Sequence, residues 1–334
     1  MTTQIYFASN KLGIITNDQL QLMLNRFNLG TLISSEKTSL GVMGQTMFVS
    51  SSTGDYILKG NPLFHGQFLE EKFFIDHLNQ HTSLHVPSPY LIDESEDIFG
   101  WSYSIMPRLP GSHMNAVDIQ SILTTTEDKE SLVLLAAHTL AELHNWKVEQ
   151  YGEFDPQLHT VRPFEGSYRT WLYTTIRYWI NDATKYSTIT TQDLTWVEQI
   201  LEGSQDIFDD LNSPTYVMGD FKPENFLIDK HNNEWSISGV FDFTTSYFGD
   251  GIADLPKMTT MYLENGDDEL ARMFLSSYLK STKQQAFRER FRVHMLHHCA
   301  LVWGCAKATQ HVTWDDELSF TQWAQRFTEF SIYK

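Results

Sequence analysis

Cysteine and long apolar runs are both scarce in this chain of 334 residues. Its 2 cysteines argue against a disulfide framework and are typical of a reducing compartment. No apolar run approaches the ~18 residues that a membrane-spanning helix needs, and the first residues lack the basic-then-apolar layout of a signal peptide. We therefore expect a cytoplasmic protein that does not insert into a membrane.

Positive charge is also low, with 24 Lys and Arg against 42 Asp and Glu and a formal net charge of -18. Binding to nucleic acid through its phosphates is therefore not expected. The negative charge is compatible with a cationic substrate, and more simply with the acidic surface that keeps many proteins in solution. A chain of this length exceeds the usual size of one hydrophobic core, so two lobes are predicted.

The most informative segment is VMGDFKPENFLI at 217–228, which GVFDF follows closely. Asp220 and Asn225 fit the D-x-x-x-x-N pattern, in which the first residue accepts a proton from a substrate hydroxyl and the last binds a metal ion. Asp242 adds an oxygen ligand of the kind that Mg²⁺ prefers beside nucleotide phosphates. Apolar residues on both sides of the polar turn at 229–233 predict two strands that bring Asn225 and Asp242 together. The alternative, a surface turn rich in Asp and Asn, is disfavoured by the joint spacing.

The beginning of the chain favours a small lobe built on strands. A helix is expected near 18–27, closed by Gly30, and the stretch 31–59 alternates apolar and polar residues in a way that predicts two hairpin strands. Gly41 and Gly44 lie in the first turn of this stretch, where they would let backbone N–H groups approach phosphates.

A strand lysine and a helix carboxylate are expected to pair. Lys59 ends the strand YILK, where a lysine that contacts nucleotide phosphates belongs, although an exposed lysine at a strand end is the alternative. The next segment, FLEEKFFIDHL at 68–78, predicts a helix with one apolar side. Glu71 would pair with Lys59 and fix its ammonium group. Glu70 is the alternative partner, and the helical phase does not decide between the two glutamates.

The segment WSYSIMPRLPG at 101–111 is the predicted linker between the lobes. An adenine ring there needs one backbone acceptor and one backbone donor. Because proline has no N–H, the predicted pair is the Pro107 C=O as acceptor and the Leu109 N–H as donor. The rest of the chain is predicted to be mostly α-helical, so we expect an α+β fold with a nucleotide-binding lobe at 1–108 and a catalytic and substrate-binding lobe at 109–334.

Together these segments resemble the aminoglycoside phosphotransferase and choline kinase superfamily, which shares the protein-kinase-like fold. The resemblance spans most of the chain and rests on GVMG, Lys59, Glu71, IMPRLPG, LAELH, MGDFKPEN and FDFTTSYFGDGIADL. It implies ATP or GTP bound between the lobes, two magnesium ions and phosphate transfer to a hydroxyl of a small molecule. By the same resemblance Asp220 is the base or orients the hydroxyl, Asn225 and Asp242 are metal ligands, Lys59 binds the phosphates, and Asp254 supports the loop.

Two other functions compete with this interpretation. A protein serine/threonine kinase is suggested by DFKPEN, but the long insertion before Asp220 and the lack of an activation segment after Asp242 disfavour it. A nucleotide-binding scaffold with a dead site is also disfavoured. Such a protein would lack one of the site residues, and the chain keeps all four of them, Lys59, Asp220, Asn225 and Asp242. The resembling family usually has His where this chain has Met218, and that change affects support of the loop more than the chemistry.

Histidines and cysteines near residue 300 offer a second candidate metal site. His294 and His298 have a spacing that zinc tolerates, and Cys299 and Cys305 lie close by. No third ligand stands at a convincing offset, so a packed helix with partly buried histidines is the favoured interpretation.

Acidic residues around the loop are the one clue to the acceptor. If several face the cleft, they favour a polycationic aminoglycoside over a neutral sugar, whereas solvated turns are the favoured explanation for most of them. The residues are Glu224, Asp250, Glu264, Asp267 and Asp268. We therefore expect a small-molecule kinase with an aminoglycoside as the leading acceptor, a role in antibiotic resistance being one consequence, and with choline, a sugar, a macrolide or an amino alcohol as alternatives.

Overall fold

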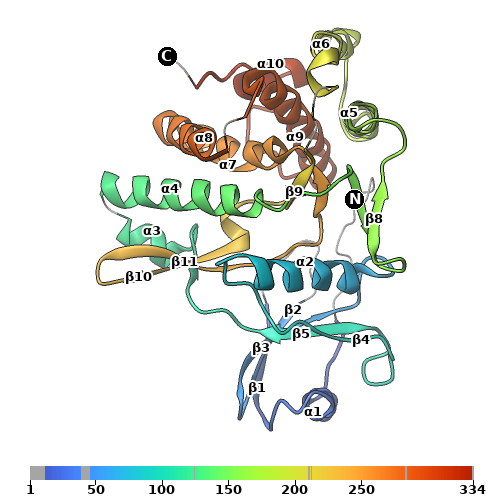
Figure 1. The fold of residues 1–334 in the computed structure, drawn as a ribbon, viewed down its shortest axis with the longest axis vertical. Coiled ribbons are helices and arrows are strands. Elements are labelled where there is room, and N and C mark those ends of the chain that lie inside the picture. The colour runs from blue at the N-terminus through green and yellow to red at the C-terminus, as the bar shows by residue number, and fades with distance from the viewer. Residues whose placement is uncertain are drawn as a thin grey trace.

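The computed structural model describes residues 12–38, 46–123, 125–209, 211, 213–282 and 284–332. It has the predicted α+β fold, with a β-rich N-terminal lobe and a larger, mostly helical C-terminal lobe (Figure 1). The predicted phosphate turn with Gly41 and Gly44 lies outside the described residues. Within the described ranges, no helix combines the length and the apolar character that crossing a membrane requires.

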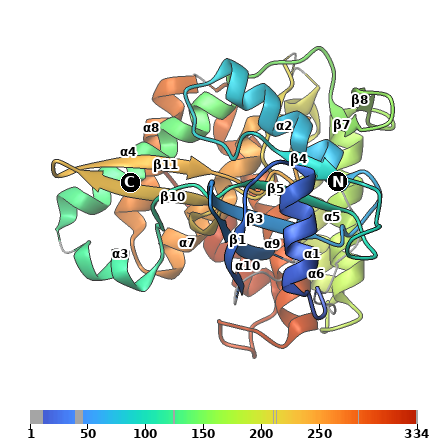
Figure 2. The ribbon, with the colours of Figure 1, turned by 90° about the horizontal axis from the view of Figure 1, so that it is seen from below.

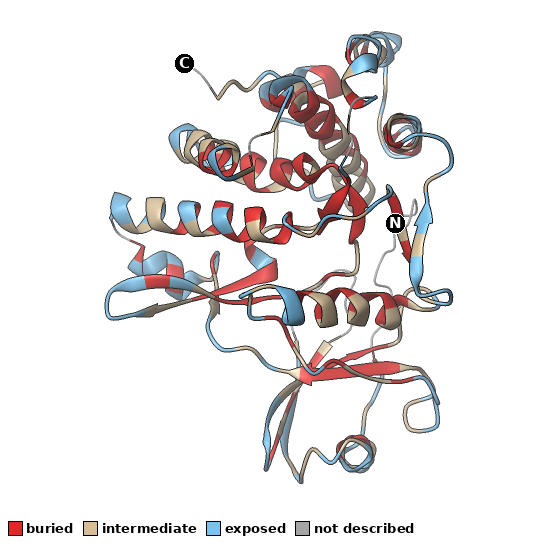
Figure 3. Cartoon of the chain, in the orientation of Figure 1, coloured by how far each residue is buried: buried red, intermediate tan, exposed pale blue. Residues whose placement is uncertain are grey.

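The N-terminal lobe is built on an antiparallel sheet with the strand order β1-β2-β3-β5-β4. Its strands are β1 (Leu32–Lys37), β2 (Thr46–Ser51), β3 (Gly54–Gly60), β4 (Leu91–Asp93) and β5 (Tyr103–Pro107). The stretch 31–59 thus holds three strands, where its alternation predicted two. The first of them, β1, is an edge strand that is exposed along most of its length (Figure 3), so burial imposes little pattern on its residues.

One face of this sheet is covered by α1 (Asn17–Arg26), close to the predicted helix at 18–27. The helix begins with a capping box in which Thr16 and Gln19 satisfy each other's backbone N–H groups. Its buried residues form a small core of their own with the sheet. This core contains Leu12, Leu20, Met23, Leu24, Met47, Val49, Leu58, Tyr103 and Ile105.

The helix α2 (Gln67–His81) joins the two lobes and lies between them in Figure 1. Its apolar side packs against the C-terminal lobe, where the Phe74 ring has four aromatic neighbours within 6.2 Å between centroids. These neighbours are Trp146, Phe154, Tyr216 and Phe248. Because Phe74 is fully buried in this cluster, α2 is held against the C-terminal lobe and carries Glu71 to the space between the lobes.

The C-terminal lobe consists mainly of helices, of which α4 packs against α8 and α5 against α9. The helices are α3 (Val117–Ile122), α4 (Thr126–Leu143), α5 (Tyr168–Ala183), α6 (Thr191–Glu202), α7 (Leu255–Glu264), α8 (Asp268–Thr282), α9 (Phe287–Thr309) and α10 (Phe320–Thr328). A buried ion pair fixes α9 to the loop before α7, since the Asp250 carboxylate accepts hydrogen bonds from Arg290 Nε and His294 Nε2, each at 2.9 Å.

Two small sheets complete this lobe. One has the order β11-β10-β6 and the other β8-β7-β12-β9. Their strands are β6 (Ser112–His113), β7 (Gly152–Asp155), β8 (Thr160–Pro163), β9 (Thr215–Val217), β10 (Phe226–His231), β11 (Glu234–Val240) and β12 (Tyr247–Gly249). The β10–β11 hairpin projects beside α3 in the two views of Figures 1 and 2, and its open end points back into the molecule.

Truncation of Phe74 tests whether the aromatic cluster couples α2 to the C-terminal lobe. We expect Phe74→Ala to lower the free energy of unfolding by about 3–5 kcal/mol, because a buried aromatic ring is lost and its cavity cannot close fully. Denaturant unfolding followed by tryptophan fluorescence measures this change. Leu134→Ala, on an exposed position of α4, is the matched control and should cost far less. A small effect of Phe74→Ala would contradict this packing.

Candidate active site

The loop that carries Asp220 runs from β9 to β10 through a 3-10 turn at Pro223–Asn225. It turns sharply at Gly219, whose φ is +75° and whose position leaves no room for a side chain. A Cβ there would lie 2.3 Å from the Thr245 carbonyl oxygen, so any other residue would push two backbone segments apart. Glycine at this position therefore lets the loop fold back against the segment that follows β11.

A buried carboxylate, Asp254, holds the backbone of this loop. Its two oxygens accept the N–H groups of Met218 and Gly219, both at 2.7 Å. The same carboxylate lies 3.0 Å from Nε2 of His144, whose Nδ1 is 2.7 Å from the Tyr278 hydroxyl. Because the loop is held through main-chain N–H groups, the side chain of Met218 is free to pack in the hydrophobic core, where it is fully buried.

Asp220 is surrounded by donors. Its Oδ2 accepts hydrogen bonds from Asn225 Nδ2 and from Lys222 Nζ, each at 2.9 Å. Its Oδ1 is paired with Lys257 Nζ from the first turn of α7. Burial alone would raise the pKa of Asp220, but the two ammonium groups outweigh it and hold the pKa below its usual range. The carboxylate is therefore ionised at neutral pH and available to a hydroxyl.

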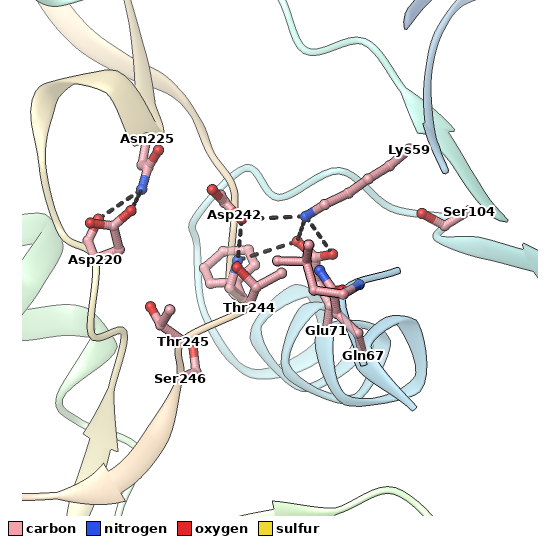
Figure 4. A network of polar contacts seen from close by, with 12 residues as sticks. Lys59, Gln67, Glu71, Ser104, Asp220, Asn225, Asp242, Thr244, Thr245 and Ser246 are labelled. Carbon is pink, nitrogen blue, oxygen red and sulfur yellow. Dashed lines mark hydrogen bonds and ion pairs between the residues drawn. The ribbon is translucent and has the colours of Figure 1, made fainter. Parts of the chain in front are cut away.

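The β10–β11 hairpin brings Asn225 and Asp242 together, as the sequence predicts. Phe226 pairs with Val240 in the register of the hairpin, and the Phe241 N–H donates to the Asn225 carbonyl at 3.0 Å. Asp242 then takes a left-handed conformation with φ at +65°, which turns its side chain out of the strand direction. Its carboxylate faces Asn225 across the gap in Figure 4.

The oxygen atoms that Asn225 and Asp242 offer as ligands fit a magnesium ion. The Asn225 amide nitrogen donates to Asp220, so its oxygen points the other way (Figure 4). The Asp242 Oδ1 accepts from Thr244 at 2.9 Å and its carboxylate is 39% exposed. Among the described residues, no group of three His, Cys, Asp or Glu could hold a metal by itself. An ion held here would therefore need further oxygen ligands from a nucleotide, as Mg²⁺ commonly does.

Lys59 forms the predicted ion pair with Glu71, and Glu70 is not its partner. The Lys59 Nζ lies 2.9 Å and 3.0 Å from the two Glu71 oxygens and 3.3 Å from Asp242 Oδ1 (Figure 4). Burial would lower the pKa of Lys59, but the carboxylates of Glu71 and Asp242 outweigh it and raise the pKa. The ammonium group is therefore charged at physiological pH, and it lies on the side where Asp242 lies.

Two residues that the sequence analysis missed fix Glu71 in turn. The Tyr90 hydroxyl donates to Glu71 Oε2 at 2.6 Å, and Ser104 Oγ donates to the Tyr90 oxygen at 2.8 Å. The Phe243 N–H also donates to Glu71 Oε1 at 3.3 Å. These groups are buried, so they orient the carboxylate without competition from water.

The linker runs along β3 in a way that is compatible with the predicted adenine contacts. The Arg108 N–H donates to the Asp55 carbonyl at 2.9 Å, on the side of β3. In a planar trans peptide the C=O and N–H point in opposite directions, so the Pro107 carbonyl points away from β3. The roles of Pro107 and Leu109 in binding a base stay predictions.

Of the acidic residues proposed to attract a cation, Glu224 lies in the same loop as Asp220 and the other four lie outside this loop. Asp250 is buried and paired with Arg290 and His294, and Glu224 Oε1 accepts a hydrogen bond from Asn115 at 2.6 Å. The other three residues, Glu264, Asp267 and Asp268, lie at the far end of α7 and the start of α8. Because His294 is paired with Asp250, it is also a structural residue of the α9 core, as the favoured interpretation held.

Comparisons with known proteins show which family and which folds the chain is similar to. The model of the phosphotransferase enzyme family matches residues 38–291. A putative aminoglycoside phosphotransferase from Ralstonia eutropha JMP134 has a similar structure, with a TM-score of 0.64 at 15% identity over 95% of this chain and 96% of that one. The comparison with curated proteins found no match.

Two solved complexes with similar folds contain nucleotides. A thermostable mutant of aminoglycoside phosphotransferase APH(4)-Ia was crystallised with ADP and hygromycin B, and it has a TM-score of 0.61 at 17% identity over 92% of this chain and 95% of that one. Wild-type aminoglycoside 2'-phosphotransferase-IIIa was crystallised with GDP, and it has a TM-score of 0.62 at 15% identity over 93% and 96% of the two chains. At these identities the likeness concerns the fold.

Neighbouring glutamates provide a matched test of the ion pair. We expect Glu71→Gln to lower nucleotide-dependent turnover by roughly tenfold to a hundredfold, because Lys59 loses the charge that orients it. Glu70→Gln removes a carboxylate from the same helical turn without touching Lys59, so turnover should stay within about twofold. Steady-state release of the nucleoside diphosphate measures both. Equal losses in the two variants would contradict the assignment of Glu71.

Glu70 also predicts a pH dependence of stability. Burial, with the nearby carboxylates of Glu153 and Glu71, raises the pKa of Glu70 to about 7 from an ordinary value of 4.5. The folded protein therefore binds the proton more tightly than the unfolded chain, and stability falls as the pH rises from about 4.5 to about 7. The full loss is of the order of 3 kcal/mol. Denaturant unfolding at pH 5 and pH 8 should show a smaller decline for Glu70→Gln than for the wild type, and identical declines would refute the prediction.

Proposed function

The chain belongs to the phosphotransferase enzyme family, and on that premise we propose that it is a small-molecule kinase that moves the γ-phosphate of ATP or GTP to a hydroxyl group. Residues 1–108 would bind the nucleotide, and residues 109–334 would carry the catalytic loop and the acceptor site. The support comes from chemistry placed in one cleft and from the nucleotides held by proteins of similar fold.

The observation that carries the proposal is the arrangement in Figure 4. Asp220 and Asn225 lie on one side of the cleft, and Asp242, Lys59 and Glu71 lie on the other. Phosphate transfer needs this separation, because the hydroxyl acceptor and the metal-bound triphosphate with its lysine occupy different parts of the site. Positioned charges of this kind are the main contribution of the protein in phosphoryl transfer, because the reaction itself needs little covalent chemistry from it.

In the proposed reaction the acceptor hydroxyl donates a hydrogen bond to the Asp220 carboxylate. The acceptor oxygen forms a bond to the γ-phosphorus while the bond from that phosphorus to the β–γ bridging oxygen breaks, and the nucleoside diphosphate leaves with the electron pair. The hydroxyl proton passes to Asp220 and from there to solvent. Since the pKa of Asp220 is held low, the residue is a weak base that acts mainly by orienting the hydroxyl and by accepting the proton late.

The remaining residues would place the phosphates. Lys59, fixed by Glu71, would contact the phosphates, and Lys222 would meet the transferred group from the Asp220 side. Magnesium, held by the oxygens of Asn225 and Asp242, would neutralise charge that develops on the phosphoryl oxygens.

Replacement of the proposed base separates turnover from nucleotide binding. We expect Asp220→Asn to lower turnover by about 10²–10⁴-fold while the Kd for a non-hydrolysable ATP analogue changes by less than about threefold, because the proposed role of the carboxylate is to orient the hydroxyl and not to bind the nucleotide. Coupled assay of ADP release and isothermal titration give the two quantities.

Asp229→Asn makes the same chemical change on the β10–β11 hairpin, away from the cleft, and serves as the control. Unchanged turnover in Asp220→Asn, with a folded protein, would rule out the assigned role. A loss in both variants would instead indicate a general effect on the loop.

A further inference from the structure

Lys257 occupies a position that the proposed transfer of phosphate does not explain. It lies in the first turn of α7, three residues after the Asp254 carboxylate that holds the catalytic loop. Its ammonium group is paired with Asp220 Oδ1. The phosphate-facing groups Asn225 and Lys222 contact the other oxygen, Oδ2. The Asp220 carboxylate thus separates Lys257 from the groups that would bind magnesium and phosphate.

The ion pair of Lys257 is with the proposed base Asp220. In the described part of the chain, Asp220 is the one carboxylate with which Lys257 forms an ion pair. The half-buried His297 and His298 of α9 lie near it, and burial lowers the pKa of both rings to about 3, with the charge of Lys257 acting in the same direction. Both rings are therefore neutral at physiological pH, and Lys257 carries a positive charge beside them and Asp220.

Lys257 keeps hydrogen-bonding capacity for a ligand. An ammonium group has three N–H donors, and the contact with Asp220 uses one of them. The side chain is 26% exposed, so an acceptor beside Asp220 can reach the remaining donors. A polycation there would place its ammonium groups next to Lys257 and Lys222, and like charges in contact select against a ligand.

We propose that the acceptor of this kinase carries an anionic group, a carboxylate or a phosphate, beside the hydroxyl that is phosphorylated, and that Lys257 binds this group. The inference rests on the proposed function and changes the leading acceptor from a polycationic aminoglycoside to an anionic hydroxy compound. In such a complex the hydroxyl would donate to Asp220 while the anionic group accepts from the free N–H groups of Lys257. Lys257 would then determine specificity.

The test compares acceptors that share a three-carbon skeleton and differ in charge. Glycerol, glycerate, glycerol 3-phosphate and 3-amino-1,2-propanediol are offered with magnesium and ATP or GTP, and hygromycin B serves as the polycation. Diphosphate release measures transfer. Binding is measured independently as the shift in melting temperature that each compound produces in the presence of magnesium and a non-hydrolysable nucleotide. Glycerate and glycerol 3-phosphate distinguish a carboxylate site from a phosphate site.

The variants are Lys257→Gln, Lys257→Glu and, as the matched control, Lys129→Gln at an exposed position of α4. We expect at least one anionic compound to act or bind at least tenfold better than glycerol in the wild type and in Lys129→Gln. This preference should disappear in Lys257→Gln and turn toward the cationic compounds in Lys257→Glu. A new preference for cationic compounds in the glutamate variant would also show that this variant is folded.

Three results would overturn the inference: a wild type that prefers cationic or neutral compounds, an anionic preference that survives in Lys257→Gln, or no compound with an effect that depends on Lys257 in either assay. In each of these cases a magnesium-dependent melting shift with the non-hydrolysable nucleotide would leave the proposed function standing. Absence of any nucleotide response in the wild type would count against the proposed function itself.

Discussion

The candidate active site depends on the buried carboxylate of Asp254. A buried anion without partners is costly, and here it is satisfied by the N–H groups of Met218 and Gly219 and by the ring of His144. These contacts join the Asp220 loop to α4 and, through the Tyr278 hydroxyl, to α8. Because Asp254 immediately precedes α7, one residue sets the place of the loop and of the helix that faces it. The side chain of Met218 takes no part in this support, since the loop is held through its backbone N–H groups.

Charge compensation prepares the cleft for ligands that are themselves charged. Lys59 is shared by Glu71 and Asp242, and the Asp220 carboxylate is shared by two lysines. Buried ion pairs of this kind contribute little net stability, because desolvation offsets much of the attraction. Their value is orientation: the charged groups stand in fixed positions before a nucleotide and an acceptor arrive. This is the property that a kinase needs and that a scaffold has no use for.

How much of the site could be predicted depends on how far apart in the sequence its contacting residues lie. Asn225 and Asp242 flank one hairpin, so a local pattern of strands and a turn was enough to bring them together. Lys59 and Glu71 lie on neighbouring elements, yet the choice between Glu71 and Glu70 depended on how α2 packs against the C-terminal lobe. Lys257 belongs to no motif and reaches Asp220 only because α7 folds back onto the loop. Long-range packing of this kind leaves no periodic signal in a sequence.

The central claim is that the γ-phosphate of a nucleotide ends on a small molecule. The most direct measurement is to incubate the protein with magnesium and γ-³²P-labelled ATP or GTP in the presence of a low-molecular-weight cell extract, and to separate labelled products by size and by chromatography. The account predicts label in a small phosphate ester that is stable to conditions under which the nucleotide is destroyed. Label confined to protein would indicate a protein kinase, and label that stays on the nucleotide or appears solely as inorganic phosphate would contradict the account.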